Sequence, residues 1–118
     1  MQQAQTCQQR SRENLAKAYR ELEAGDLTQA SEKGWGAAAL MVKAIAQQRG
    51  WRHRRHNWLY AAVDDLSQET GDEELNRLFR LASDLHTNFY EGFYRPRQVR
   101  AGLRDVERFV ERVERLLA

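Results

Sequence analysis

The strongest constraint on the fold is a helical repeat of apolar side chains within residues 73–94. Steps of three and four residues place such side chains on one face of an amphipathic helix. The repeat consists of Leu75, Leu78, Ala82, Leu85, Phe89 and Phe93. Arg80, His86 and Tyr90 lie in the same segment, beside the apolar face. The sequence therefore predicts a core-facing helix that also carries side chains capable of chemistry.

Four other segments show helical periodicity, at about 7–24, 27–48, 57–68 and from 96 to the C-terminus. Thr6 is the expected cap of the first, and Gly25 with Asp26 joins the first two as an antiparallel hairpin. Gly50 and Pro96 mark later boundaries. Short connections between such segments predict an all-α, up-and-down antiparallel bundle of about five helices.

The composition supports this fold class. A chain of 118 residues with 42% hydrophobic side chains can bury one core, so a single domain over residues 1–118 is expected. Seven glycines and one proline are too few for the many turns of an all-β fold. No apolar run approaches the roughly 20 residues that cross a bilayer, and the polar N-terminal segment does not resemble a signal peptide. With Cys7 as the single cysteine, these features favour a cytoplasmic protein without an internal disulfide.

Positive charge is concentrated in two segments, although the formal net charge is only +2. Residues 49–55 contain four arginines and one histidine without an acid, and residues 95–115 contain seven arginines against four acids. In the second segment the acids lie one helical turn from several arginines, which favours a solvated, salt-bridged face over phosphate binding.

Residues 49–58, which include the first basic segment, also interleave Trp51 and Trp58 with the arginines. Single-stranded RNA binding uses this mixture, because arginines neutralise phosphates while flat rings stack on bases. The candidate RNA-binding residues are Arg49, Arg52, His53, Arg54, Arg55, His56 and Tyr90. In the alternative interpretation, Trp51 and Trp58 plug the ends of the bundle and the arginines are solvated in a loop.

Metal binding has little support in the sequence. His53 and His56 have the spacing of some zinc ligands, but Cys7 is far away, and Asp64 and Asp65 lie in the next predicted helix. The chain contains no HExxH or CxxC motif and no glycine-rich phosphate loop. Neither a metal site nor a cofactor is therefore expected.

His86 is the candidate catalytic residue, because histidine can transfer protons near neutral pH. Arg80 could stabilise a phosphate during RNA cleavage. Six residues along a helix correspond to a rotation of about 600°, which places the two side chains on different faces. They can meet only if the helix is distorted, if the arginine reaches around it, or if a second subunit completes the site. The alternative is a structural histidine held by a hydrogen bond.

Three segments resemble the HEPN superfamily of small helical bundles, in its short prokaryotic members. They are Ala30-Ser-Glu-Lys-Gly-Trp-Gly-Ala-Ala-Ala-Leu40, Gly50-Trp-x-His53-x-x-His56 and Leu85-His-Thr-Asn-Phe-Tyr-Glu91. The resemblance covers about residues 12–116 and implies an RNA- or nucleotide-binding role. Many members are metal-independent endoribonucleases whose sites form where two subunits meet. Arg80 and His86 match the arginine-to-histidine motif of those members, which implies that His86 acts as acid or base and that Arg80 binds phosphate.

The same resemblance implies partners. Members often form toxin–antitoxin pairs with a nucleotidyltransferase, and a homodimer is expected for this chain. Non-catalytic members also exist, and here Leu81 follows the arginine where catalytic members commonly have a polar residue. A non-catalytic dimerisation or scaffold module that binds a protein partner is therefore the second hypothesis.

Overall fold

The computed structural model describes residues 2–117, with side chains from Thr6 onward. Residues 1 and 118 of the expected domain lie outside this range. The described chain forms the helices α1 (Gln2–Glu23), α2 (Leu27–Arg49), α3 (His56–Thr70), α4 (Glu74–Glu91) and α5 (Pro96–Glu114). Because no strand occurs within residues 2–117, the predicted all-α fold is confirmed.

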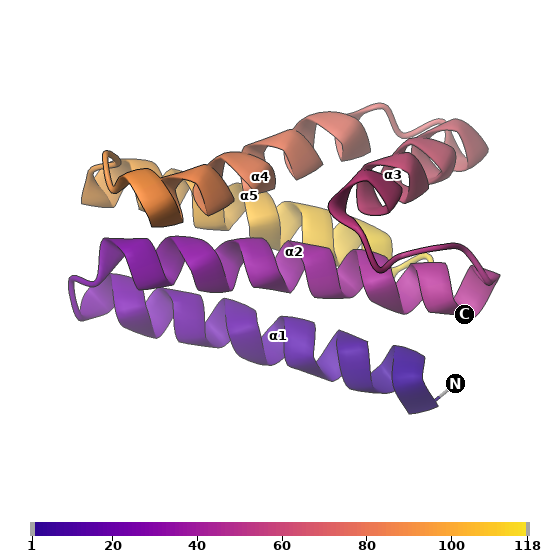
Figure 1. The fold of residues 1–118 in the computed structure, drawn as a ribbon, viewed down its shortest axis with the longest axis horizontal. Helices are drawn as coiled ribbons and strands as arrows, with labels where there is room; N and C mark the ends of the chain where they lie inside the picture. Colours follow the sequence, from indigo (N-terminus) through magenta and orange to yellow (C-terminus); the bar gives the residue numbers. More distant parts are fainter. Residues whose placement is uncertain (1, 118) are drawn as a thin grey trace.

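The helices form an antiparallel bundle with α2 at its centre. α1, α2, α4 and α5 run alternately back and forth along the long axis, while the shorter α3 packs over one end of the bundle (Figure 1). α2 contacts all four other helices, and α3 contacts α2 and α4. Asp26, in the predicted joint between the first two helices, caps α2, since its side chain accepts a hydrogen bond from the Gln29 N–H.

Small residues on α2 allow its neighbours to approach closely. A Cβ atom at Gly34 would lie 2.5 Å from Leu103 Cδ2 and 3.1 Å from Leu85 Cδ1. A Cβ atom at Gly102 of α5 would lie 2.7 Å from Leu85 Cδ2. Two leucines therefore occupy the space that side chains at these glycines would need, and this packing fixes α4 and α5 against α2.

A continuous hydrophobic core joins all five helices. Its largest fully buried side chains are Phe79, Phe109, Met41, Ile45, Leu59, Leu66, Leu75, Leu78, Leu85 and Leu103. The core-facing members of the predicted repeat in α4 are buried through Leu85, which confirms the helical periodicity of that segment.

Three predicted helix ends are wrong, one of them in α5, which ends at Glu114 and does not run on to the C-terminus. α1 begins at Gln2, so Thr6 is inside the helix and is not its cap. α4 ends at Glu91 and does not continue to residue 94. Gly92 takes a left-handed φ of 64°, which ends the helix, and Phe93 is 60% exposed where the sequence placed it on the buried face.

A buried amide fixes the turn that follows α4. Asn88 is fully buried, and its Oδ1 accepts hydrogen bonds from the Phe93 and Tyr94 N–H groups at 2.9 and 2.8 Å. Its Nδ2 donates to Ser31 Oγ of α2 at 2.9 Å, and that hydroxyl donates to the Leu27 carbonyl at 2.8 Å. The network anchors the end of α4 to α2 and directs the chain toward α5.

Arginines of α5 connect it to other elements. Arg112 Nη1 donates to both carboxylate oxygens of Asp72 at 2.8 and 2.9 Å, and Arg100 pairs with Glu23 at 3.2 Å. The expected pairing within α5 occurs between Arg108 and Asp105, at 3.6 Å, whereas Arg112 and Arg100 pair with carboxylates outside α5.

We expect Gly34→Ala to destabilise the protein relative to Gly36→Ala by about 1–3 kcal/mol, because it overpacks buried leucines. Both changes remove a glycine from α2 and gain similar helix propensity. The matched change at Gly36 meets only the Asn14 amide, 2.9 Å from the added Cβ, which can turn away toward solvent. Chemical denaturation of both variants measures the difference, and equal free energies of unfolding would contradict the packing described here.

A second prediction concerns the α1–α5 contact at Glu114. Hydrogen bonding from Arg12 holds the pKa of this carboxyl below its ordinary value of 4.5, and Gln8 adds a second bond at 2.8 Å. A lowered folded-state pKa stabilises the fold above 4.5, and this contribution is lost as the pH falls through the folded-state value. Glu114→Gln should lower the free energy of unfolding at pH 7 by about 0.5–1 kcal/mol, since the pair is partly exposed. The difference from the parent should disappear in strong acid, and a difference that persists there would contradict this account.

Candidate functional site

The central feature of the candidate site is a hydrogen bond between side chains of α4 and α2. His86 Nδ1 lies 2.9 Å from Glu32 Oε1, and the histidine side chain is 25% exposed. A carboxylate only accepts hydrogen bonds, so Nδ1 is the ring nitrogen that carries the proton. Nε2 has no hydrogen-bond partner among the described residues and is not an enclosed unpartnered atom, so it reaches solvent. The pair therefore orients the imidazole and leaves one nitrogen available for proton transfer.

Aromatic rings from three helices surround this histidine. The ring of His56, the first residue of α3, lies 5.5 Å from that of His86 in an edge-to-face arrangement. Trp35 of α2 lies 5.4 and 5.3 Å from the two histidine rings, and Tyr90 lies 5.2 Å from His86. We call Glu32, Trp35, His56, His86 and Tyr90 the His56–His86 cluster.

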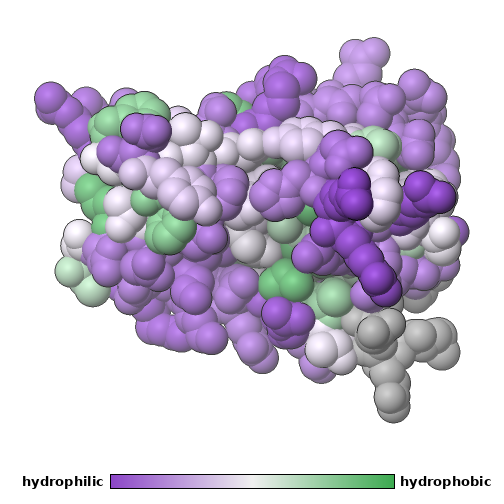
Figure 2. All heavy atoms as spheres, viewed as in Figure 1, coloured by the Kyte–Doolittle hydropathy of each residue, from purple (hydrophilic) through white to green (hydrophobic). Residues whose placement is uncertain are grey.

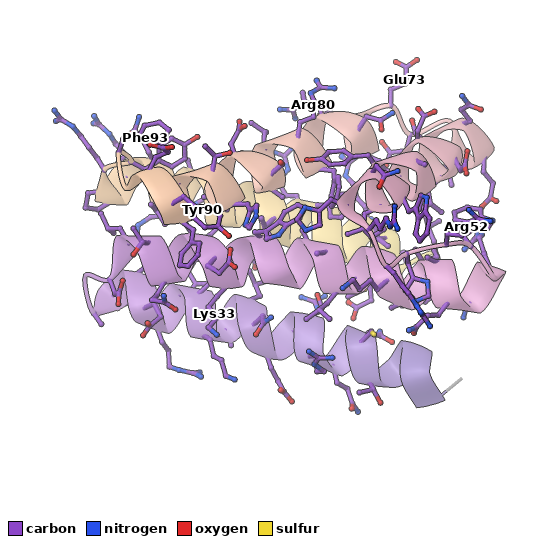
Figure 3. All side chains as sticks on the ribbon, viewed as in Figure 1. Lys33, Arg52, Glu73, Arg80, Tyr90 and Phe93 are labelled. Carbon is purple, nitrogen blue, oxygen red and sulfur yellow. The ribbon has the colours of Figure 1, made fainter. Side chains whose placement is uncertain are left out.

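The side of the cluster that faces the core is buried, and the opposite side is exposed to solvent. Trp35 is 5% exposed and packs on Phe79 in the core, whereas Tyr90 is 72% exposed. In Figure 3, Tyr90 lies over the junction of α2 and α4. Beside the cluster, the Tyr60 hydroxyl of α3 donates to Ser83 Oγ of α4 and holds the two helices together. Trp35 therefore fixes the two histidines on the side that faces the core, and solvent reaches them from the opposite side.

The arrangement suits acid–base chemistry. Two imidazoles in one open cluster can act on two atoms of the same substrate, and a carboxylate on Nδ1 stabilises the imidazolium that forms when Nε2 accepts a proton. The exposed ring of Tyr90 can stack on a planar group. Within residues 2–117, no group of three or more histidine, cysteine, aspartate or glutamate side chains has a geometry that could hold a metal ion.

Arg80 does not join the cluster within one chain. It is exposed on α4, and Figure 3 shows it pointing away from α2, on another side of the helix from Tyr90. It makes no hydrogen bond or ion pair with another described residue, so its guanidinium is available to an external group. The structure thus agrees with the rotation expected for a six-residue separation, and α4 does not bring Arg80 to His86.

The predicted RNA-binding arginines lie at the end of the bundle where α2 connects to α3, and strongly hydrophilic residues gather there in Figure 2. Arg52 and Arg55 are exposed, with guanidinium carbons 5.2 and 5.4 Å from the ring of Trp58. Arg54 is exposed, and Arg49 pairs with Glu69 at 2.6 Å. Three exposed arginines therefore remain free of acidic partners among the described residues.

Two other residues of this segment have structural contacts. His53 Nδ1 lies 3.0 Å from the Trp51 carbonyl, and its Nε2 lies 3.4 Å from Gln47 Nε2. Trp51 is partly buried against the core, so the interpretation that it plugs an end of the bundle is confirmed. Trp58 has Arg52 and Arg55 over its ring, so a base that stacked there would have to displace them.

Sequence reasoning found His56, His86 and Tyr90 but missed Glu32 and Trp35 as their neighbours. The three-residue spacing of the last two places them on one side of α2, but many charged residues share that kind of spacing with an apolar one. Only the packing of α4 on α2 shows which carboxylate meets the histidine.

Comparison with known proteins identifies the family. The profile of the archaeal PaREP1/PaREP8 family matches residues 8–110. The chain belongs to the PaREP1/PaREP8 family. This PaREP1/PaREP8 protein is also similar to a crystal structure of a Sulfolobus solfataricus protein, with a TM-score of 0.82 and 22% identity. The match covers 92% of this chain and 97% of that one, and at this identity it establishes a shared fold.

No curated protein matches this PaREP1/PaREP8 chain. In the described residues, no helix is both long and apolar enough to span a membrane. These matches establish the family and the helical fold. They do not assign the chain to the HEPN superfamily.

Proposed function

We propose that this protein is a HEPN-like RNA-binding protein of the cytoplasm that cleaves RNA as a homodimer without a metal. One observation carries the proposal: His86, oriented by Glu32 at 2.9 Å, lies next to His56 in a solvent-reachable cluster. An oriented imidazole with a free nitrogen is what proton abstraction from a ribose hydroxyl requires.

The proposed reaction uses the 2′-hydroxyl of the substrate. Nε2 of His86 takes the hydroxyl proton while the 2′-oxygen attacks the adjacent phosphorus. The bond from phosphorus to the 5′-oxygen breaks, and the imidazolium of His56 gives that oxygen a proton. The products are a 2′,3′-cyclic phosphate and a 5′-hydroxyl end, so atoms and charge balance. Glu32 stabilises the positive charge that develops on His86.

Arg80 is the proposed ligand of the phosphate, supplied by a second copy of the chain. Its exposure and lack of acidic partners within residues 6–117 leave the guanidinium free to reach another molecule. In a two-fold dimer each copy gives one Arg80 and receives one, so two equivalent sites form.

We call residues 49–55, at the end of α2 and in the connection to α3, the basic connection. In this proposal RNA lies along the basic connection and reaches the His56–His86 cluster. Arg55 is the N-cap residue of α3 and directly precedes His56, and Arg52 stacks over the same tryptophan as Arg55. Arginines at this position can hold phosphates on either side of the scissile bond, while Tyr90 offers an exposed ring for a base.

Exposed aromatic residues favour a second candidate, a non-catalytic module that binds a protein such as a nucleotidyltransferase. Tyr90 and Phe93 are 72% and 60% exposed, and both lie near the C-terminal end of α4. Large exposed rings are common in protein interfaces. In this alternative the His86–Glu32 pair only fixes α4 against α2.

His86→Ala should reduce cleavage of labelled RNA by about 10²–10⁴-fold in the presence of a chelator, since it removes the general base. Thr87→Ala, an exposed neighbour on α4, is the matched control and should retain parental activity. Product analysis should show a 2′,3′-cyclic phosphate. If the folded parent gives no more product than His86→Ala, the enzyme proposal is refuted and the interaction module is favoured.

The same assay tests the shared site. Arg80→Ala should also be inactive, and refolding an equal mixture of the two inactive variants should restore about a quarter of the parental activity, because half of the random dimers contain one intact site of two. Arg77→Ala, whose arginine is already paired with Glu74, is the control for Arg80. If the refolded mixture gains no activity, Arg80 does not act across a dimer.

Replacing Arg52, Arg54 and Arg55 with alanine should weaken RNA binding and flatten its salt dependence. Each lost phosphate contact lowers the slope of log K against log salt by roughly 0.7 for a single strand, so a decrease of about 2 is expected. Replacement of Lys17, Arg20 and Lys33 removes the same charge elsewhere and should leave the slope nearly unchanged. Equal slopes for the two triple variants would contradict RNA binding by the arginines of the basic connection.

A further inference from the structure

A second basic site lies outside the His56–His86 cluster. A surface pocket of about 580 Å³ is formed where the beginning of α1, the end of α2 and the connection to α3 come together. Figure 1 shows these three segments at the same end of the molecule. The pocket is lined by Thr6, Cys7, Arg10, Leu40, Lys43, Gln47, His53 and Arg54. Its lining contains three permanent cations and no acid.

None of the three cations of this pocket is neutralised by a carboxylate among the described residues. Arg12, Arg49 and Arg112 pair with carboxylates of other elements at the protein surface. Arg10 and Lys43, in contrast, make no ion pair with any described residue, and neither does Arg54. Three like charges around one pocket repel each other, and a bound anion would offset that repulsion.

Gln47 also offers a hydrogen-bond acceptor, which an anion without a donor group cannot satisfy. His53 Nδ1 can only donate to the Trp51 carbonyl, at 3.0 Å, so in the neutral ring Nε2 is an acceptor. The Gln47 Nε2 group therefore faces it, at 3.4 Å, and Oε1 is directed elsewhere. That oxygen is the buried side-chain atom without a hydrogen-bond partner among the described residues. Because this oxygen is enclosed, a ligand reaches it when the Gln47 side chain turns toward the pocket, and a ligand that brings a hydroxyl or amino donor then satisfies it.

From these contacts we infer that the pocket binds a phosphomonoester with a nearby hydroxyl or amino group. The phosphate lies among Arg10, Lys43 and Arg54, and the donor group satisfies Gln47. Cys7 and Leu40 provide an apolar wall for the carbon skeleton. The assignment does not depend on RNA cleavage at the His56–His86 cluster.

Calorimetric titration of the full chain with ribose 5-phosphate tests the site. The Arg10→Ala/Lys43→Ala variant should bind about tenfold more weakly or worse, because two charge-assisted contacts are lost. The Lys17→Ala/Arg97→Ala variant has the same net charge and should bind like the parent. Equal affinity of both double variants would overturn the inference, as would absence of saturable binding to the parent.

Gln47 gives a second, independent test. The parent should prefer ribose 5-phosphate over methyl phosphate, which lacks a donor, and Gln47→Leu should abolish that preference. Retained preference in the variant would overturn the role of Gln47. Competition by a 5′-phosphorylated RNA, but not by its 5′-hydroxyl form, would identify the phosphomonoester as an RNA end. Competition by neither RNA would identify it as a free small molecule.

RNA cleavage separates this inference from the proposed function. Arg10→Ala/Lys43→Ala leaves His86, His56 and Arg80 intact, so cleavage of a 5′-hydroxyl RNA should proceed as in the parent. Loss of ribose 5-phosphate binding with normal cleavage supports two separate sites. A parallel loss of cleavage and binding would overturn the separation.

Discussion

The close packing of α4 and α5 on α2 at Gly34 determines where the functional side chains lie. Because Gly34 has no side chain, Leu85 and Leu103 fill the space against the central helix. Leu85 directly precedes His86, so the depth at which this leucine packs also sets the height of the histidine above α2. At that height the imidazole meets Glu32, whose position on α2 is two residues before the glycine. A change in the packing would therefore separate the pair without altering either of its members.

The His56–His86 cluster combines buried aromatic rings that fix its position with exposed groups that a substrate could contact. Trp35 closes it from below and Phe79 supports the tryptophan, so the two histidine rings rest on a rigid aromatic floor. Tyr90 contacts the His86 ring and exposes most of its own ring to solvent. Asn88, two residues after His86, holds the end of α4 by three side-chain hydrogen bonds, to Ser31 Oγ and to the Phe93 and Tyr94 N–H groups. The polar residues are thus positioned by buried neighbours rather than by loops.

The distribution of charge separates structural arginines from available ones. Arginines along α5 and on α1 form bridges that connect helices, including the bidentate contact of Arg112 with Asp72. Around the connection between α2 and α3, cations lack such partners, and the tryptophan there carries two guanidinium groups. A net charge of +2 for the whole chain conceals this difference, because it does not show which cations are paired with carboxylates.

The sequence by itself determined the helices, their approximate bounds and the all-α class, because apolar periodicity and glycine or proline boundaries are local properties. It also identified His86, His56 and Tyr90 as chemically notable, and the helical rotation between Arg80 and His86. It placed Phe93 wrongly, since the left-handed Gly92 ends α4 before the repeat does. Only the tertiary structure decided that Glu32 and Trp35 meet the histidines and that Arg10, Lys43 and Arg54 surround one pocket. These residues are distant along the chain, and their proximity follows from which helix faces pack together, a property that no single segment contains.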